Sequence, residues 1–189
     1  MYNKTLVILL SGKAGMGKTL AAKILKDCFI SKNLNVINSS FATGAKEIAY
    51  KYIGWDGIKD EKGRKLLQIL GTDVGRKYNP DCWVEYLLRT LENTSNFPYD
   101  VVIIDDWRFP NEFEYFKDEP LYNVVKVKIL SREIKTYLNH DCGNHISENS
   151  LPEDKSYYNY TVFNDFIESN FLEKLAGLCD KLDSLQSKF

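Results

Sequence analysis

The sequence predicts an α/β fold in which a parallel sheet of five strands is flanked by helices. Short apolar runs recur along the chain, and such runs are typical of strands that are buried on both faces of a parallel sheet. Between them lie longer segments whose apolar residues recur at helical spacing, which predicts helices that cover the sheet. A glycine-rich loop joins the first apolar run to the first of these helices.

The glycine-rich loop has the sequence of a P-loop, because residues 12–19 match G-x-x-x-x-G-K-[ST]. In such a loop the backbone N–H groups wrap an anion, Lys18 reaches the β- and γ-phosphates of ATP, and the Thr19 hydroxyl can bind Mg²⁺. A glycine turn without a nucleotide is the alternative, but the buried strand expected at 5–10 and the helix expected from about Gly17 favour the P-loop. The residues expected to bind ATP are Gly12, Lys13, Ala14, Gly15, Met16, Gly17, Lys18 and Thr19.

Length and composition narrow the class of protein. A chain of 189 residues can build one sizeable core, so we expect a single domain over 1–189. The 25 Lys and Arg residues are balanced by 26 Asp and Glu residues, which gives no support for nucleic acid binding. No apolar stretch approaches the ~20 residues that span a bilayer, and the four cysteines are scattered as in proteins with reduced thiols. We therefore expect a cytoplasmic protein without a membrane partner.

A helical region is expected from about 42 to 93. It follows a second strand at 35–41, and its first helix is predicted over about 42–52. Lys46 lies one turn into this helix, where it either meets a substrate phosphate or remains solvated. The stretch 54–63 is rich in turn-forming residues and is predicted to be a loop.

Two further helices complete this region. One is predicted to begin at Arg64 and carries Arg76 near its end. Asn79 and Pro80 predict the N-cap and the first residue of the other helix. Trp83 lies one residue off the apolar stripe of that helix, so it either edges a pocket or covers the core.

A third apolar run, at 99–106, ends in two carboxylates and has the form of a Walker-B strand. One of Asp105 and Asp106 should reach Mg²⁺ directly or through water. Arg108 follows at once, and its fixed fork of donors would lie at the carboxyl edge of the sheet, where open α/β folds bind ligands. Pro110 is placed to open a short helix.

The C-terminal part of the chain contains two more predicted strands, at 123–130 and 160–163. Asn164 and Asp165 are expected to cap a closing helix that packs on the sheet. Between these strands, the segment from about 132 to 156 is polar and is predicted to be a lid with Arg132 at its hinge.

Part of this lid, from His140 to His145, superficially resembles a metal cluster. A closed zinc site needs a fourth ligand and firm geometry, so we do not expect a metal there.

These features together describe a small P-loop phosphotransferase. Such an enzyme places donor and acceptor phosphates in line, spreads the developing charge over Lys, Arg and Mg²⁺, and closes a lid to exclude water. ATP is the expected co-substrate. The catalytic residues expected are Lys18, Arg108 and Arg132. The residues expected at Mg²⁺ are Thr19, Asp105 and Asp106.

Several motifs also resemble those of the phage-type deoxynucleoside monophosphate kinases, in the family's order and over nearly the whole chain. The most specific are D-x-R-F-P-N-E at 106–112 and H-x-S-E at 145–148. The resemblance implies an adenylate-kinase-like fold and transfer of the ATP γ-phosphate to a deoxynucleoside monophosphate. By this match Asp106, two residues before Arg108, holds the family's acidic position, and the direct partner of Mg²⁺ stays open. The other matching runs are 55–57, 62–64, 70–76 and 79–83.

The same motifs and the segments that flank the P-loop imply a site for the acceptor. Its phosphate is expected at Lys46, Arg64 and Arg76, and its sugar or base at Trp83, Asn111 and Glu112. If the chain is phage-encoded, the host cytoplasm is the expected compartment.

Two other functions remain open on the sequence. One is another small-molecule kinase on the same scaffold, such as a phosphomevalonate or nucleoside kinase. The other is a non-catalytic nucleotide-binding module whose lid contacts a partner protein. The sequence determines neither the base accepted nor the oligomeric state, a homodimer included.

Overall fold

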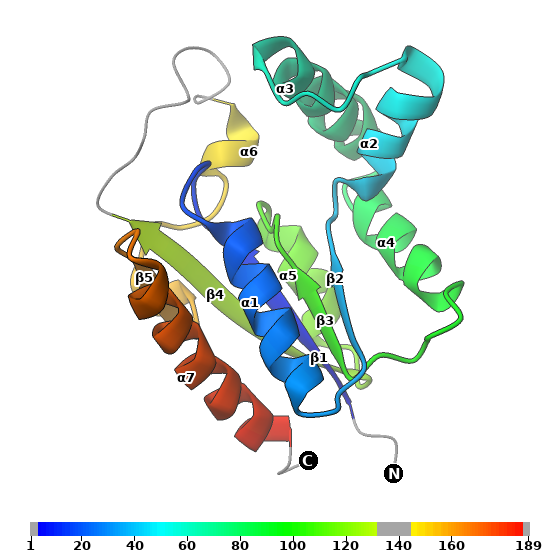
Figure 1. Cartoon of the computed structure of the whole chain (residues 1–189). Coiled ribbons are helices and arrows are strands. Elements are labelled where there is room, and N and C mark those ends of the chain that lie inside the picture. The colour runs from blue at the N-terminus through cyan, green and yellow to red at the C-terminus, as the bar shows by residue number, and fades with distance from the viewer. Residues whose placement is uncertain (1–3, 132–144, 187–189) are drawn as a thin grey trace.

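The computed structural model describes residues 4–131 and 145–186. They form a five-stranded sheet in the order β2-β3-β1-β4-β5, and every neighbouring pair of strands is parallel (Figure 1). The predicted fold class is confirmed. The strands are β1 (Thr5–Ser11), β2 (Val36–Ser39), β3 (Val101–Ile104), β4 (Tyr122–Ser131) and β5 (Tyr160–Asn164). The α-helices are α1 (Lys18–Ser31), α2 (Thr43–Ile48), α3 (Glu61–Gln68), α4 (Cys82–Glu92), α5 (Pro110–Lys117), α6 (Ile146–Asn149) and α7 (Glu168–Gln186).

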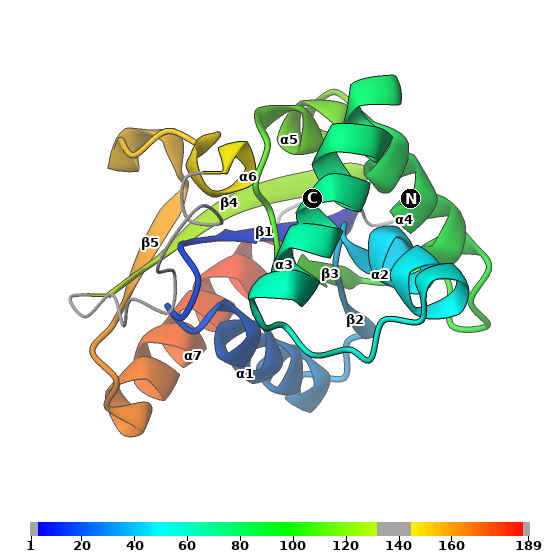
Figure 2. The same ribbon diagram turned by 90° about the horizontal axis from the view of Figure 1, so that it is seen from above.

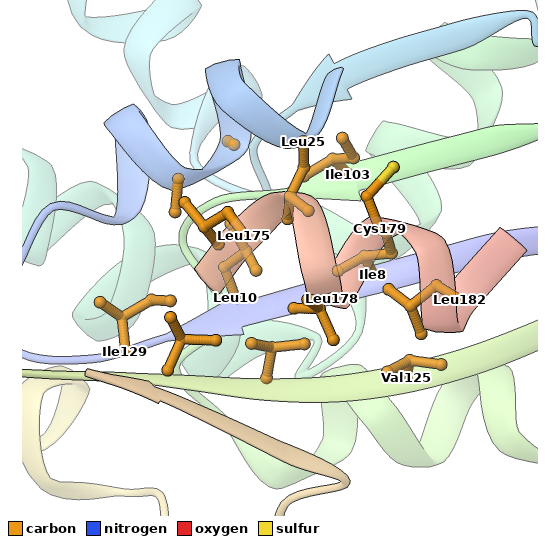
Figure 3. Packing of buried hydrophobic residues seen from close by; sticks show 14 of the residues in the cluster. Ile8, Leu10, Leu25, Ile103, Val125, Ile129, Leu175, Leu178, Cys179 and Leu182 are labelled. Carbon is orange, nitrogen blue, oxygen red and sulfur yellow. The ribbon is translucent and has the colours of Figure 1, made fainter. Parts of the chain in front are cut away.

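Helices cover both faces of the sheet. Viewed from above, α1 and α7 lie on one face and α4 and α5 on the other (Figure 2). The central strand β1 is buried on both faces: Ile8 and Leu10 belong to the core under α1 and α7, and Val7 and Leu9 belong to the core under α4 and α5. Figure 3 shows the first of these cores, where Leu25 of α1 and Leu175 of α7 meet β1.

This arrangement explains why the predicted strands read as continuous apolar runs. Successive side chains of a strand point to opposite faces, and here each face meets a hydrophobic layer. The carboxyl ends of the parallel strands meet at one edge of the sheet, and the segment from α2 to α3 stands above that edge (Figure 1). The sheet edge therefore becomes the floor of a site.

Two π-helical turns extend helices of the region from 42 to 93. The turn η1 (Ala49–Ile53) continues α2, and η2 (Ile69–Arg76) continues α3. Insertions of this kind widen a helix locally and are frequent at functional sites. The predicted helices at 42–52 and from 64 onward are thus present, but part of each has π geometry.

Some predicted boundaries were wrong, each for a local reason. The expected loop 54–63 ends early, because the Asp60 side chain accepts a hydrogen bond from the Gly63 backbone N–H at 2.7 Å and caps α3 from Glu61. Asn79 does not cap α4; its side chain accepts from the Asp81 backbone N–H at 3.0 Å, and the helix begins at Cys82.

The closing helix also begins later than expected, at Glu168. Asn164 ends β5 instead, and its side-chain amide donates to the Met16 carbonyl at 3.1 Å. Phe166 then adopts a φ of 62°, which turns the chain toward the helix.

Of the segment predicted as a lid, Arg132, His140 and Cys142 lie outside the described residues. The part from 145 to 156 contains α6 and leads into a 3₁₀ turn, η4 (Lys155–Tyr157). Leu151 packs against the core under α4 and α5, so this second half is a packed element.

The described residues also bear on the metal and membrane expectations. Within them, no group of three or more His, Cys, Asp and Glu side chains is arranged to hold a metal ion. Nor does any helix in 4–131 or 145–186 combine the length and the apolar character of a membrane span.

Candidate active site

A cleft of about 750 Å³ lies at the carboxyl edge of the sheet, between the P-loop and the helices of the region from 42 to 93. In open α/β folds this edge is where ligands bind. Its walls come from the P-loop, the ends of β2 and β3, helices α2, α3 and α6, and the turn η2. The predicted site residues that line it are Ala14, Gly15, Lys18, Thr19, Lys46, Arg64, Arg76, Trp83, Asp105, Asp106 and Arg108.

Glycines shape the P-loop because their positions exclude side chains. Gly12, Gly15 and Gly17 have φ values of 150°, 83° and 92°, which other residues rarely adopt. A Cβ on Gly12 would lie 2.6 Å from the Ile129 carbonyl oxygen, and one on Gly17 would lie 2.6 Å from the Asn164 side chain. The loop is therefore pressed onto the ends of β4 and β5.

Met16 differs from its neighbours in the loop. Its side chain is buried and belongs to the core under α1 and α7, so it anchors the loop to that core. Directly after the loop, Gly17 precedes the first helical residue of α1. The positive end of this helix and its free N–H groups face the loop, which favours a bound anion.

Lys18 folds back over the loop. Its ammonium donates hydrogen bonds to the carbonyls of Gly12 and Lys13, at 2.5 and 3.0 Å. The pKa of Lys18 is lowered to about 8, chiefly by burial and also by the positive charge of Arg108, although the nearby carboxylates act to raise it. A polyphosphate in the cleft would reverse this effect, because its negative charge favours the protonated lysine.

Oxygen donors suited to Mg²⁺ meet beside the start of α1. The Thr19 side chain is hydrogen-bonded to Asp105, whose pKa is raised by burial and by the charge of Asp106. Asn38, on β2, lines the same cleft, and its Oδ1 is the single buried side-chain oxygen or nitrogen without a hydrogen-bond partner among the described residues. Mg²⁺ prefers oxygen ligands, and it commonly takes one or two from the protein and the others from phosphates and water. This donor set fits Mg²⁺.

Asp106 has a different environment. Its carboxylate accepts hydrogen bonds from the backbone N–H groups of Phe41 and Ala42, at 2.8 and 3.0 Å, and from the Ser40 hydroxyl at 2.7 Å. These contacts tie the end of β3 to the connection between β2 and α2. The two adjacent carboxylates therefore have different partners. Asp105 lies beside Thr19, and Asp106 anchors the connection between β2 and α2.

Cationic side chains from α2, α3, η2 and the segment before α3 also line the cleft. Lys46 donates to the Ser40 hydroxyl at 3.1 Å, and Arg64 donates through Nε to the Lys59 carbonyl at 2.9 Å. Lys59 itself lines the cleft, and burial and the charge of Lys46 lower its pKa. Sequence reasoning missed Lys59 because it lies in a turn-rich stretch where nothing in the pattern distinguishes it from a solvated lysine.

Trp83 combines the two roles that the sequence left open. It is 7% exposed and belongs to the core under α4 and α5, yet it also lines the cleft. Its indole N–H donates to the Gly71 carbonyl at 2.7 Å. Cβ atoms on Gly44 and Gly75 would lie 2.8 and 2.6 Å from its ring, so these glycines allow the ring to fit between α2 and η2.

Arg108 reaches α6 from the loop after β3. Its guanidinium forms an ion pair with Glu148 and donates to the Ser147 carbonyl at 3.1 Å. Ser147 and Glu148 line the cleft but were not among the predicted site residues, although they belong to the H-x-S-E motif.

Asn111 and Glu112, which were predicted to border the acceptor, do not line this cleft. Asn111 donates to the Pro80 carbonyl at 2.9 Å and to Asp81 at 2.8 Å, and it lines a neighbouring hollow of about 340 Å³. Glu112 is fully buried and forms an ion pair with Arg76. Both lie in the first turn of α5, where their side chains turn back toward the segment before α4 and toward η2.

The comparisons with known proteins give the fold a context. No family model and no curated protein matches the sequence. Among solved structures, the chain is similar to the Mycobacterium tuberculosis APS kinase CysC in complex with AMPPNP and APS, with 10% identity and a TM-score of 0.51 over 95% of this chain and 98% of that one. It is also similar to a putative kinase from Chloroflexus aurantiacus, with 11% identity and a TM-score of 0.52 over 94% of this chain and 98% of that one.

Proposed function

We propose that this chain transfers the γ-phosphate of ATP to a deoxynucleoside monophosphate, giving ADP and the deoxynucleoside diphosphate. The fold is that of P-loop kinases, and the motif resemblance points to this acceptor class. The observation that carries the proposal is the division of one cleft into two sides. The P-loop, Thr19 and Asp105 line one side, and Lys46, Lys59, Arg64 and Arg76 bring four cations to the other.

The donor side suits the polyphosphate of ATP. The P-loop backbone would wrap the β- and γ-phosphates, and Lys18 would leave its carbonyl partners to bridge them. Thr19 and Asp105 would hold Mg²⁺, which neutralises phosphate charge when bound, and the unpartnered Oδ1 of Asn38 lines the same cleft. The neighbour from M. tuberculosis was solved with AMPPNP, which agrees with ATP as donor.

The acceptor side suits a monophosphate. Arg64 and Arg76 can bind a phosphate through two parallel hydrogen bonds, which a lysine cannot reproduce. Arg108 and Lys18, together with Arg132 as the sequence predicts, would stabilise the charge on the phosphoryl group as it moves from donor to acceptor. Trp83 offers an aromatic wall on which the sugar or the base would pack.

A coupled ADP-release screen over all ribo- and deoxynucleoside monophosphates tests the proposal. We expect at least one deoxynucleotide to be phosphorylated with higher kcat/KM than its ribo counterpart, by about 10²-fold, because a wall that merely lacks room for a hydroxyl discriminates by about that factor. Equal kcat/KM for every ribo and deoxy pair would contradict the acceptor class. ATP binding without ADP formation on any acceptor would instead favour the non-catalytic module.

A further inference from the structure

Glu112 is a buried carboxylate at the centre of a hydrogen-bond network. Its side chain is 0% exposed. One carboxylate oxygen accepts from Nη2 of Arg76 at 2.5 Å, and the other accepts from the backbone N–H groups of Arg108 and Phe109 at 2.9 and 3.0 Å. All three of these partners are donors, so the network suits the ionised form of the carboxylate.

The guanidinium of Arg76 is held on several sides. It pairs with Glu112, its carbon Cζ lies 4.3 Å from the centre of the Phe109 ring, and it donates through Nη1 to the Pro80 carbonyl at 3.4 Å. The Arg76 side chain is 13% exposed and lines the cleft, whereas Glu112 does not. The carboxylate therefore acts on the cleft through Arg76 and not by direct contact.

Capping a helix does not require a carboxylate buried in this way. The first turn of α5 could be satisfied by a small polar residue at the N-cap, which would leave its side chain near solvent. Removing a carboxylate from water costs free energy unless charged and hydrogen-bonding partners compensate. Here the compensating cation is a residue of the acceptor side, and the backbone groups belong to the loop that carries Arg108.

We propose that Glu112 is a positioning residue that holds Arg76 at a fixed place relative to the Arg108 loop, and so sets the acceptor phosphate against the donor phosphate. This inference rests on the proposed function. Arg76 reaches the network from η2 and Arg108 from the loop after β3, so a single carboxylate joins the two sides of the cleft. Without it, Arg76 would keep its charge but lose its orientation.

The charges around Glu112 determine how pH should act on this arrangement. The pKa of Glu112 is raised to about 7, chiefly by burial and also by the carboxylate of Asp106, although the charge of Arg76 and the two backbone N–H groups act to lower it. Protonation would remove the negative charge that attracts Arg76. Binding of the acceptor should therefore weaken as the pH falls through about 7.

The test compares Glu112→Gln with Glu114→Gln in steady-state kinetics, with the acceptor found by the screen and with ATP. Glu114 lies on the same helix and forms a surface ion pair with Lys117, so it is a matched control outside the site. We expect Glu112→Gln to raise KM for the acceptor at least tenfold, to change KM for ATP by less than twofold, and to remove the acid limb of the acceptor kcat/KM near pH 7. The control should retain the wild-type constants.

A double-mutant comparison isolates the route of the effect. If Glu112 acts through Arg76, Glu112→Gln combined with Arg76→Ala should be no worse than Arg76→Ala alone. Independent, additive losses, an unchanged acceptor KM, or an equal rise in KM for ATP would overturn the inference. If Glu112→Gln does not fold, the pH profile of Arg76→Ala tests the inference instead. The acid limb of its acceptor kcat/KM near pH 7 should be absent, and a persisting limb would overturn the inference. Failure of the proposed function is a separate outcome, because the wild type would then phosphorylate no deoxynucleotide.

Discussion

Asp105 and Asp106 are adjacent in sequence, but the structure predicts that changing each to asparagine impairs a different property of the protein. Asp106→Asn should destabilise the fold, because its carboxylate accepts hydrogen bonds from Phe41, Ala42 and Ser40. Asp105→Asn should leave the fold intact and impair the use of Mg²⁺, because Asp105 lies beside Thr19 at the cleft.

The cost of Asp106→Asn can be estimated from its partners. Asparagine has one acceptor oxygen, so at least one backbone N–H would face its NH₂ group. A hydrogen bond to a charged group contributes about 1.5–3 kcal/mol, and a buried donor left unpaired costs about 1–3 kcal/mol. Allowing for relaxation of the loop, we expect a loss of about 2–4 kcal/mol in the free energy of unfolding. For a chain of this length that is a fall of about 5–12 °C in Tm.

Asp105→Asn should behave differently in the same assay. Burial and the charge of Asp106 raise the pKa of Asp105, so the folded protein already disfavours its ionised form. Removing that charge should change the free energy of unfolding by less than about 1 kcal/mol, as for substitutions that leave packing and hydrogen bonds in place. Its kcat should fall by about 10²-fold or more, which is typical of a lost electrostatic group at a reacting phosphate.

Thermal and urea unfolding of the ligand-free proteins, with Mg²⁺ titrations of the rate, separate the two residues. Two results would refute the reasoning. One is an Asp105→Asn protein that loses as much stability as Asp106→Asn. The other is an Asp106→Asn protein with wild-type Tm whose defect is confined to its Mg²⁺ requirement, because Asp106 would then be the residue that meets the ion.

Three further outcomes are expected. Lys18→Ala should lower kcat/KM by about 10²-fold or more with folding intact, because in the proposed function the lysine bridges the phosphates between which charge moves. Near wild-type turnover would remove the P-loop from the mechanism. Gly75→Ala should destabilise the protein by about 1–3 kcal/mol, since its Cβ would lie 2.6 Å from the Trp83 ring. Gly177→Ala has open space at the Cβ and should stabilise the protein by up to about 1 kcal/mol. Equal urea midpoints for the two variants would contradict this packing. In the folded protein the pKa of Glu112 is about 7 against an ordinary 4.5, so between these pH values the native state keeps a proton that the unfolded state releases. The free energy of unfolding of wild type should therefore fall relative to that of Glu112→Gln as the pH rises from 4.5 to 7. A difference between the two proteins that is constant or changes in the other direction would show that the carboxylate stays ionised.

The sequence by itself determined the fold class and located the P-loop. Strands buried on both faces have no polar positions, so their apolar runs are visible without a structure. The P-loop is equally visible, because its glycines, Lys18 and Thr19 are consecutive in the chain and their spacing follows from the shape of a phosphate group. The same holds for the two carboxylates that end β3.

Only the tertiary structure decided what neighbouring residues of like chemistry do. Asp105 and Asp106 lie in the turn after β3, where the first meets Thr19 and the second meets the backbone of Phe41. Glu112 reads from the sequence as a substrate contact, but its partner Arg76 lies 36 residues away along the chain. A pattern within one segment carries no information on such pairings, because they depend on how η2, α5 and the end of β3 pack together.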